Sequence, residues 1–211
     1  MHADTTAMNE LWTALGVMQQ AGLEFEVVST DTFIQDEVTG QGNTITTTLD
    51  ALDEEEVLKY DGLMIVSGNM KDTELYWTHP KVQAFVLYAH TADMPMAAIC
   101  CSVPTIRLAA NGKRVSFYPL VRSRALLQQA GAILSTVAIS VDGKLVTAEH
   151  QMASQVWAEH FVKVMNGEET DPGLTDSGYT PMGKTPKRFA PEVELAREKF
   201  RKMKEGGDTD G

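Results

Sequence analysis

The 211-residue sequence is poor in cysteine, and its two cysteines, Cys100 and Cys101, are neighbours. Adjacent thiols cannot link distant segments, which excludes a secreted disulfide framework. A four-ligand zinc site is excluded because no second cysteine pair exists, and we expect neither a metal nor a cofactor. No apolar run approaches the roughly 18 residues of a membrane span, and no signal-peptide pattern follows Met1. We therefore expect a cytoplasmic protein with no membrane contact.

Basic residues are also in the minority: 18 Lys and Arg stand against 29 Asp and Glu, a formal net charge of −11. Phosphates would be repelled by such a surface, so we expect no nucleic-acid partner. The hydrophobic share of 43% is enough for one sizeable core. We expect a single domain over 1–167. The polar stretch at 168–211 predicts an arm with one short helix and a disordered end.

Strand-like and helix-like segments alternate along the domain. Strands are expected at 23–29, 62–66, 96–100, 115–118, 133–140 and 144–148. Helices are expected at 8–18, 53–60, 80–89, 103–110, 120–130 and 153–165. The Asp142-Gly143 pair between the last two strands is a hairpin signal. This alternation predicts an α/β fold whose sheet is mostly parallel, with helices on both faces.

One apolar run, 96–99, ends abruptly at Cys100, and a helix-like segment follows at once. Ligands bind beyond the carboxyl ends of buried parallel strands. The amides and dipole of a helix N-terminus favour an anion, so the pattern predicts a reactive Cys100 thiolate with a lowered pKa. The alternative is an inert buried thiol. Cys101 is either a small residue packed at the helix start or a resolving thiol.

Four motifs in order then resemble a known family, the PfpI/ThiJ superfamily. They are Ala97-Ala98-Ile99-Cys100 with Pro104, the segment 60–69 (YDGLMIVSGN), Glu10 ahead of Ala21-Gly22, and the hairpin 141–148 (VDGKLVTA). The superfamily includes Parkinson's-disease-associated deglycase-like proteins and has a class I glutamine amidotransferase-like fold. The resemblance implies a flavodoxin-like three-layer α/β/α sandwich and a nucleophile elbow at Cys100.

Three departures from the family pattern matter. The strand that usually precedes the glutamate is lacking. The position after the nucleophile, often histidine, is Cys101. The His-Pro of several members is Tyr118-Pro119 here, so the usual histidine partner is missing from both positions.

The resemblance also implies roles for further residues. Glu10 would be a protonated hydrogen-bond donor or a general acid/base, the alternative being an exposed glutamate at a helix start. Gly68 and Cys101 would offer backbone N–H groups to an oxyanion, although Gly68 can also serve only a tight turn. His150 borders the implied site and can replace the lost histidine or be an ordinary loop residue. Tyr118 can line the pocket or belong to the core.

We therefore expect a cysteine-dependent enzyme acting on a small carbonyl or amide-like substrate. Glyoxalase/deglycase-like chemistry is favoured over hydrolase or hydratase chemistry because it can proceed with Cys and Glu alone. Two alternatives remain open: a redox-sensing or stress-protective protein using an oxidisable cysteine, and a catalytically idle dimeric domain. The resemblance implies a homodimer, with a small molecule as the only other partner.

Overall fold

The computed structural model describes residues 2–3, 5–36, 42–45, 47–68 and 70–171, all of which belong to one compact unit. The predicted arm from residue 172 onward, including its short helix, lies outside the described residues. The boundary at residue 167 therefore stays a prediction.

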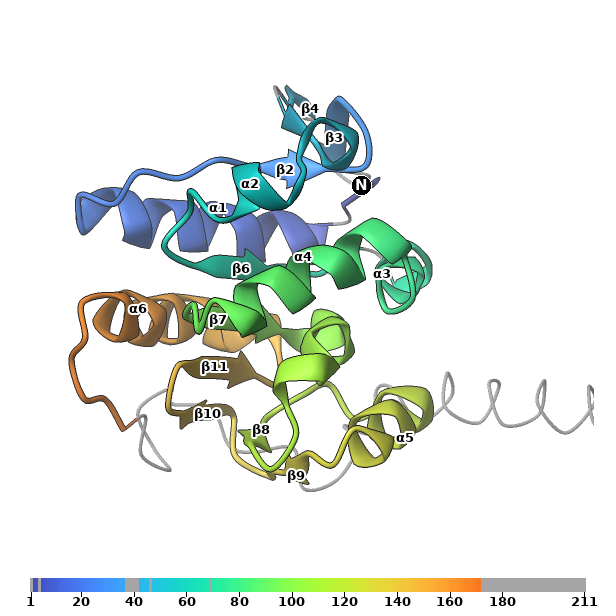
Figure 1. Ribbon diagram of the computed structural model, residues 1–211, viewed down its shortest axis with the longest axis vertical. Coiled ribbons are helices and arrows are strands. Elements are labelled where there is room, and N and C mark those ends of the chain that lie inside the picture. The colour runs from blue at the N-terminus through green and yellow to red at the C-terminus, as the bar shows by residue number, and fades with distance from the viewer. Residues whose placement is uncertain (1, 4, 37–41, 46, 69, 172–211) are drawn as a thin grey trace, which may run out of the picture. The chain divides into compact units, whose positions relative to one another are not determined.

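A four-stranded sheet forms the centre of the molecule, in the order β10-β11-β7-β6 (Figure 1). Its strands are β6 (Leu63–Ile65), β7 (Met96–Ile99), β10 (Ile139–Asp142) and β11 (Leu145–Ala148). The strands β6, β7 and β11 are parallel, and β10 is antiparallel to β11. Asp142 pairs with Leu145 across the predicted hairpin, and the turn between them places Gly143 at φ 62°, a conformation that glycine adopts readily.

Helices cover both faces of this sheet. Those of the first face are α1 (Thr5–Gln20) and α6 (Ser154–Met165). Those of the second are α4 (Pro80–Thr91), the 3-10 helix η2 (Cys100–Ala109) and α5 (Val121–Gln129). Strand β7 serves both layers because its side chains alternate: Ala97 and Ile99 pack in the α1/α6 core, whereas Met96 and Ala98 pack in the other. The three-layer α/β/α sandwich is thereby confirmed.

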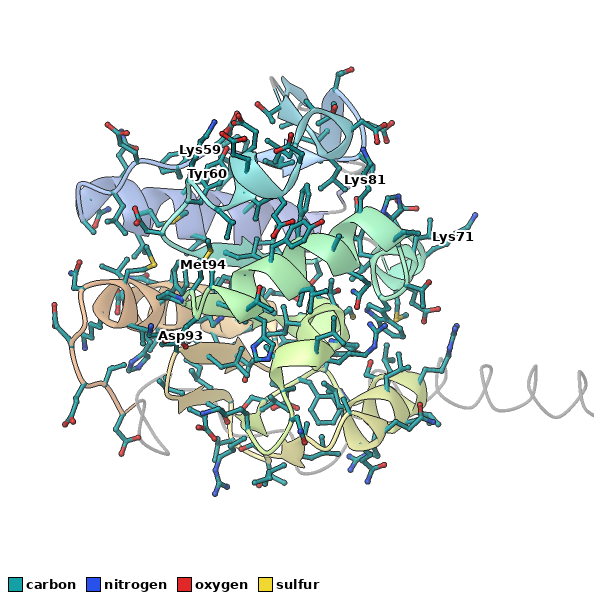
Figure 2. The ribbon with its side chains drawn as sticks, viewed as in Figure 1. Lys59, Tyr60, Lys71, Lys81, Asp93 and Met94 are labelled. Carbon is teal, nitrogen blue, oxygen red and sulfur yellow. The ribbon has the colours of Figure 1, made fainter. Side chains whose placement is uncertain are left out.

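The smaller elements lie around this core. The additional strands are β1 (His2–Ala3), β2 (Val28–Ser29), β3 (Phe33–Asp36), β4 (Gly42–Thr44), β5 (Thr47–Thr48), β8 (Arg114–Val115) and β9 (Ile133–Leu134). The additional helices are η1 (Leu49–Ala51), α2 (Glu54–Val57), α3 (Met70–Tyr76) and η3 (Gln151–Ala153). Charged side chains project outward from several of them, as Lys71 does from α3 (Figure 2).

Two differences from the sequence-based expectations are informative. The strand predicted at 23–29 is only Val28–Ser29, because that pair alone meets a partner strand, β5. The N-terminal strand β1 pairs with β3 rather than with β6. Within the described residues, β6 therefore has β7 as its single neighbour, and its residues are half-buried where those of β7 are fully buried.

Candidate active site

The turn from β7 into η2 places Cys100 in a left-handed backbone conformation, with φ 58°. This region costs a non-glycine residue about 1–3 kcal/mol, and it persists only where the surroundings hold it. The Ser102 side chain helps to hold it, because its Oγ accepts the Ile99 N–H at 3.1 Å and lies 2.6 Å from the Ile99 carbonyl oxygen. The predicted elbow is therefore present.

The two backbone carbonyls of the elbow are also bonded. The buried Trp77 indole Nε1 donates to the Cys101 carbonyl at 2.8 Å, and the Tyr118 N–H donates to the Cys100 carbonyl at 3.4 Å. Trp77 follows α3, a helix that the sequence reasoning did not predict. The indole thus ties the end of α3 to the thiol pair.

Glu10 lies on α1 and is fully buried, so it is not the exposed helix-start residue of the alternative reading. Its Oε2 accepts two hydrogen bonds from Ser67, one from the backbone N–H at 2.7 Å and one from the hydroxyl at 2.8 Å. Ser67 follows β6, and its Oγ also lies 3.0 Å from the carbonyl oxygen of Ile99. The carboxyl group is therefore connected to the end of β7 through one hydroxyl.

The Cys100 thiol does not have the lowered pKa that the sequence analysis expected; its pKa is raised well above its ordinary value. The largest cause is the hydrogen bond that Cys100 Sγ donates to Cys101 Sγ at 3.8 Å, which holds the proton. Burial and the Cys101 charge add to it, whereas the Cys101 N–H and the Ser67 hydroxyl lower the pKa. The lowered pKa was expected from the helix amides alone, whereas the neighbouring Cys101 thiol has the larger effect and raises the pKa.

The Gly68 N–H, an expected oxyanion donor, is engaged in this structure. It donates to the Thr73 hydroxyl oxygen at 2.8 Å, and Thr73 is fully buried on α3. Gly68 can serve an oxyanion only if this bond opens, whereas the Cys101 N–H already acts on the Cys100 sulfur. Sequence reasoning missed Thr73, for which no motif gives a signal, and gave Ser67 no role of its own.

His150 and Tyr118 are brought together on the other side of the elbow, with ring centroids 6.0 Å apart. His150 is buried directly after β11, and its Nδ1 accepts the Met152 N–H at 3.3 Å as the cap of η3. Tyr118 is half-buried against the core cluster that contains Cys100 and Cys101. The structure thus brings these two predicted residues together, and Nδ1 of His150 is occupied in capping a helix.

Over the described ranges, no cluster of three or more His, Cys, Asp or Glu side chains is arranged to hold a metal ion. In the same part of the chain, no helix is both long and apolar enough to cross a bilayer.

Comparison with known proteins agrees with this geometry. A sequence model described as the DJ-1/PfpI family matches residues 1–164. The chain belongs to the DJ-1/PfpI family. An uncharacterised protein of Methanocaldococcus jannaschii is 29% identical over 162 residues, which cover 74% of this chain and 75% of that protein.

Solved structures of the family share the fold. A ThiJ/PfpI domain protein of Brachyspira murdochii has a TM-score of 0.67 at 19% identity, covering 79% of this chain and 93% of its own. Schizosaccharomyces pombe DJ-1 has a TM-score of 0.64 at 15% identity, covering 87% and 96%. Oxidised Toxoplasma gondii DJ-1 has a TM-score of 0.64 at 19% identity, covering 78% and 86%. The family includes cysteine-dependent enzymes; the homodimer and the cytoplasmic location stay predictions.

Proposed function

We propose that this protein is a cysteine-dependent enzyme of the glyoxalase/deglycase type, with Cys100 as nucleophile and a small carbonyl compound as substrate. The observation that carries the proposal is the buried Glu10–Ser67 pair beside the strained elbow, with hydrogen bonds of 2.7 and 2.8 Å. It combines a nucleophile at a sharp turn with a carboxyl group able to move protons.

The raised pKa of Cys100 means that the group at neutral pH is a thiol, so its attack needs a proton acceptor at hand. Ser67 supports such a path, because its hydroxyl donates to Glu10 and also lowers the pKa of the Cys100 thiol. Sγ would bond to the aldehyde carbon while its proton passes through Ser67 to Glu10. The Cys101 N–H would stabilise the oxygen of the adduct.

For a 2-oxoaldehyde the rest of the reaction needs only the same groups. Glu10 would first return the thiol proton to the adduct oxygen, which gives the neutral hemithioacetal. Its carboxylate would then move a proton from the aldehyde carbon to the neighbouring carbon, as the hydroxyl proton passes to the neighbouring oxygen, leaving a thioester on Cys100. Water would then release a 2-hydroxy acid and restore the thiol. No amine leaving group has to be protonated, which suits a site whose nearby histidine, His150, has Nδ1 engaged with Met152.

Amide hydrolysis is the weaker reading for the same reason. A peptidase or amidase uses a histidine to protonate the departing nitrogen. The positions at which the family places that histidine are Cys101 and Tyr118 here. We therefore expect no appreciable peptidase or amidase turnover.

The test is methylglyoxal consumption and lactate formation by the full chain and by Cys100→Ser. The wild type should form lactate, and the variant should lose at least roughly 10³-fold in kcat/KM while its thermal unfolding stays cooperative. Consumption by Cys100→Ser at the wild-type rate would overturn the proposal, as would a wild-type protein that forms no lactate.

A further inference from the structure

The two cysteines of the elbow touch through their sulfur atoms, with Cys100 Sγ 3.8 Å from Cys101 Sγ. Both are free thiols, and they are the only cysteines of the chain. In an extended strand, neighbouring side chains point to opposite faces. The contact therefore depends on the left-handed backbone at Cys100, with φ 58°, which turns the chain between them.

We propose that Cys101 is the resolving thiol of Cys100, so that a hydroperoxide converts the pair to a vicinal disulfide that reversibly blocks the nucleophile. This inference rests on the proposed function only in taking Cys100 as the thiol that an electrophile reaches first. It adds a regulatory oxidation to that site, with a small hydroperoxide as the oxidant and a soluble thiol as the reductant.

The first step uses the polar groups already found at the elbow. The Cys100 thiol gives up its proton as Sγ attacks one peroxide oxygen, the O–O bond breaks, and the departing oxygen takes that proton to leave as water or an alcohol. Cys100 becomes a sulfenic acid, oxidised by two electrons, and the peroxide is reduced by two. The Ser67 hydroxyl and the Cys101 N–H both lower the pKa of this thiol, so they stabilise the negative charge that develops on the attacking sulfur.

The second step needs only the neighbouring residue. Cys101 Sγ attacks Cys100 Sγ, the S–O bond breaks, and the hydroxyl leaves as water with the Cys101 proton. One hydrogen peroxide thus becomes two waters as two thiols become one disulfide. A thiol held at 3.8 Å has a large effective concentration, so closure should outrun attack by a second peroxide molecule.

Burial of the two thiols determines which oxidant can reach them, and strain in the disulfide makes it easy to reduce. Cys100 is only 6% exposed and Cys101 only 7%, which favours a small peroxide over a bulky disulfide oxidant. Adjacent Cα atoms lie about 3.8 Å apart across a trans peptide, closer than the usual range of about 4.4–6.8 Å for disulfides. Strained disulfides are reduced readily, so this one is a transient block rather than a structural crosslink.

The experiment treats the full chain with graded hydrogen peroxide at neutral pH, then acid-quenches it for intact and peptide mass spectrometry. The wild type should lose two hydrogens, lose both thiols together, and regain them with dithiothreitol. Cys101→Ala should instead give a dimedone-trappable Cys100, followed by sulfinate that dithiothreitol does not reverse. At equal dose, sulfinate should exceed that of the wild type by roughly tenfold.

A second variant guards against misfolding: Cys101→Ser keeps the side-chain size and should behave as Cys101→Ala does. Wild-type Cys100 sulfinate with Cys101 still reduced would overturn the proposal. Disulfide-linked dimers, or no thiol loss at doses that oxidise free glutathione, would do so too. None of these outcomes involves methylglyoxal, so failure of the switch and failure of the enzymatic proposal are distinguishable.

Discussion

The two sides of the Cys100 elbow differ in what their polar side chains bond. On the β6 side, Glu10 and Ser67 bond to each other, and the Ser67 hydroxyl lowers the pKa of the Cys100 thiol. On the β11 side, the rings of His150 and Tyr118 lie near each other, but Nδ1 of His150 accepts a backbone N–H as the cap of η3. Glu10 and His150 are both buried, yet Glu10 bonds to the residue that lowers the pKa of the Cys100 thiol, whereas His150 Nδ1 bonds to a helix cap. Proximity of a titratable side chain is therefore a weaker guide to its role than the partners of its atoms.

Glu10→Gln should produce the largest effect on the β6 side. The amide is close in size to the carboxyl but cannot carry the proton, so kcat/KM for methylglyoxal should fall by about 10²–10³-fold. Steady-state kinetics with lactate detection measure this. If kcat/KM of Glu10→Gln stays within about threefold of the wild type while the Cys100→Ser variant is inactive, Glu10 does not carry the proton.

Ser67→Ala removes the hydroxyl that connects Glu10 to the thiol but leaves the Ser67 N–H bond to the carboxyl. We expect a loss of roughly 10–100-fold in kcat/KM, smaller than that of Glu10→Gln because water can occupy the gap. Ser116→Ala is a matched control, since its buried hydroxyl bonds Ser140 Oγ at 2.7 Å on the β8 side. Equal losses in both variants would show a general packing effect instead.

Trp77→Phe should reveal how the elbow is held. It leaves the Cys101 carbonyl without its indole donor, which should cost about 1–3 kcal/mol of unfolding free energy. Trp157→Phe removes a comparable bond to the Val146 carbonyl, at 3.2 Å, within the other layer. Urea unfolding should show similar destabilisation for both, whereas only Trp77→Phe should slow methylglyoxal turnover. Equal slowing by the two variants would contradict the positioning role.

Cys101→Ala has the smallest expected effect, a change in pH dependence. The hydrogen bond to Cys101 is the largest cause of the raised Cys100 pKa, so its removal should lower that pKa. Because the thiolate is the reactive form, alkylation by iodoacetamide should then begin at lower pH than in the wild type. A profile displaced to higher pH would mean that Cys101 stabilises the Cys100 thiolate instead. Ultraviolet thiolate absorbance, corrected with Cys100→Ala, gives an independent reading.

The fold could be predicted from sequence where a local signal decides the structure. Pro80 begins α4, Asp53 caps α2 by accepting the Glu56 N–H, and Gly143 turns the β10–β11 hairpin. The lack of a strand immediately ahead of Glu10 was also expected from the polar N-terminal residues, and among the described residues β6 pairs only with β7. In contrast, α3 carries no clear periodicity and was not predicted.

The site residues were grouped from sequence by family resemblance, but their bonding could not be read from it. The Thr73 bond to Gly68 and the contact between the thiols depend on how distant layers pack and how one backbone angle turns. The pKa of Cys100 is raised rather than lowered for the same reason. Its main cause is the Cys101 side chain, whose direction no sequence pattern specifies. Sequence spacing therefore grouped the candidate residues, and tertiary packing decided which of their atoms form hydrogen bonds.

We expect that Glu10, on the β6 side, accepts the proton of Cys100, and that His150, on the β11 side, does not. The most direct test is the ratio of kcat/KM for methylglyoxal between His150→Gln and Glu10→Gln, measured side by side on folded protein. We expect that kcat/KM of His150→Gln stays within about threefold of the wild type and exceeds that of Glu10→Gln by roughly 10²-fold. A ratio near one, or a larger loss in His150→Gln, would contradict it.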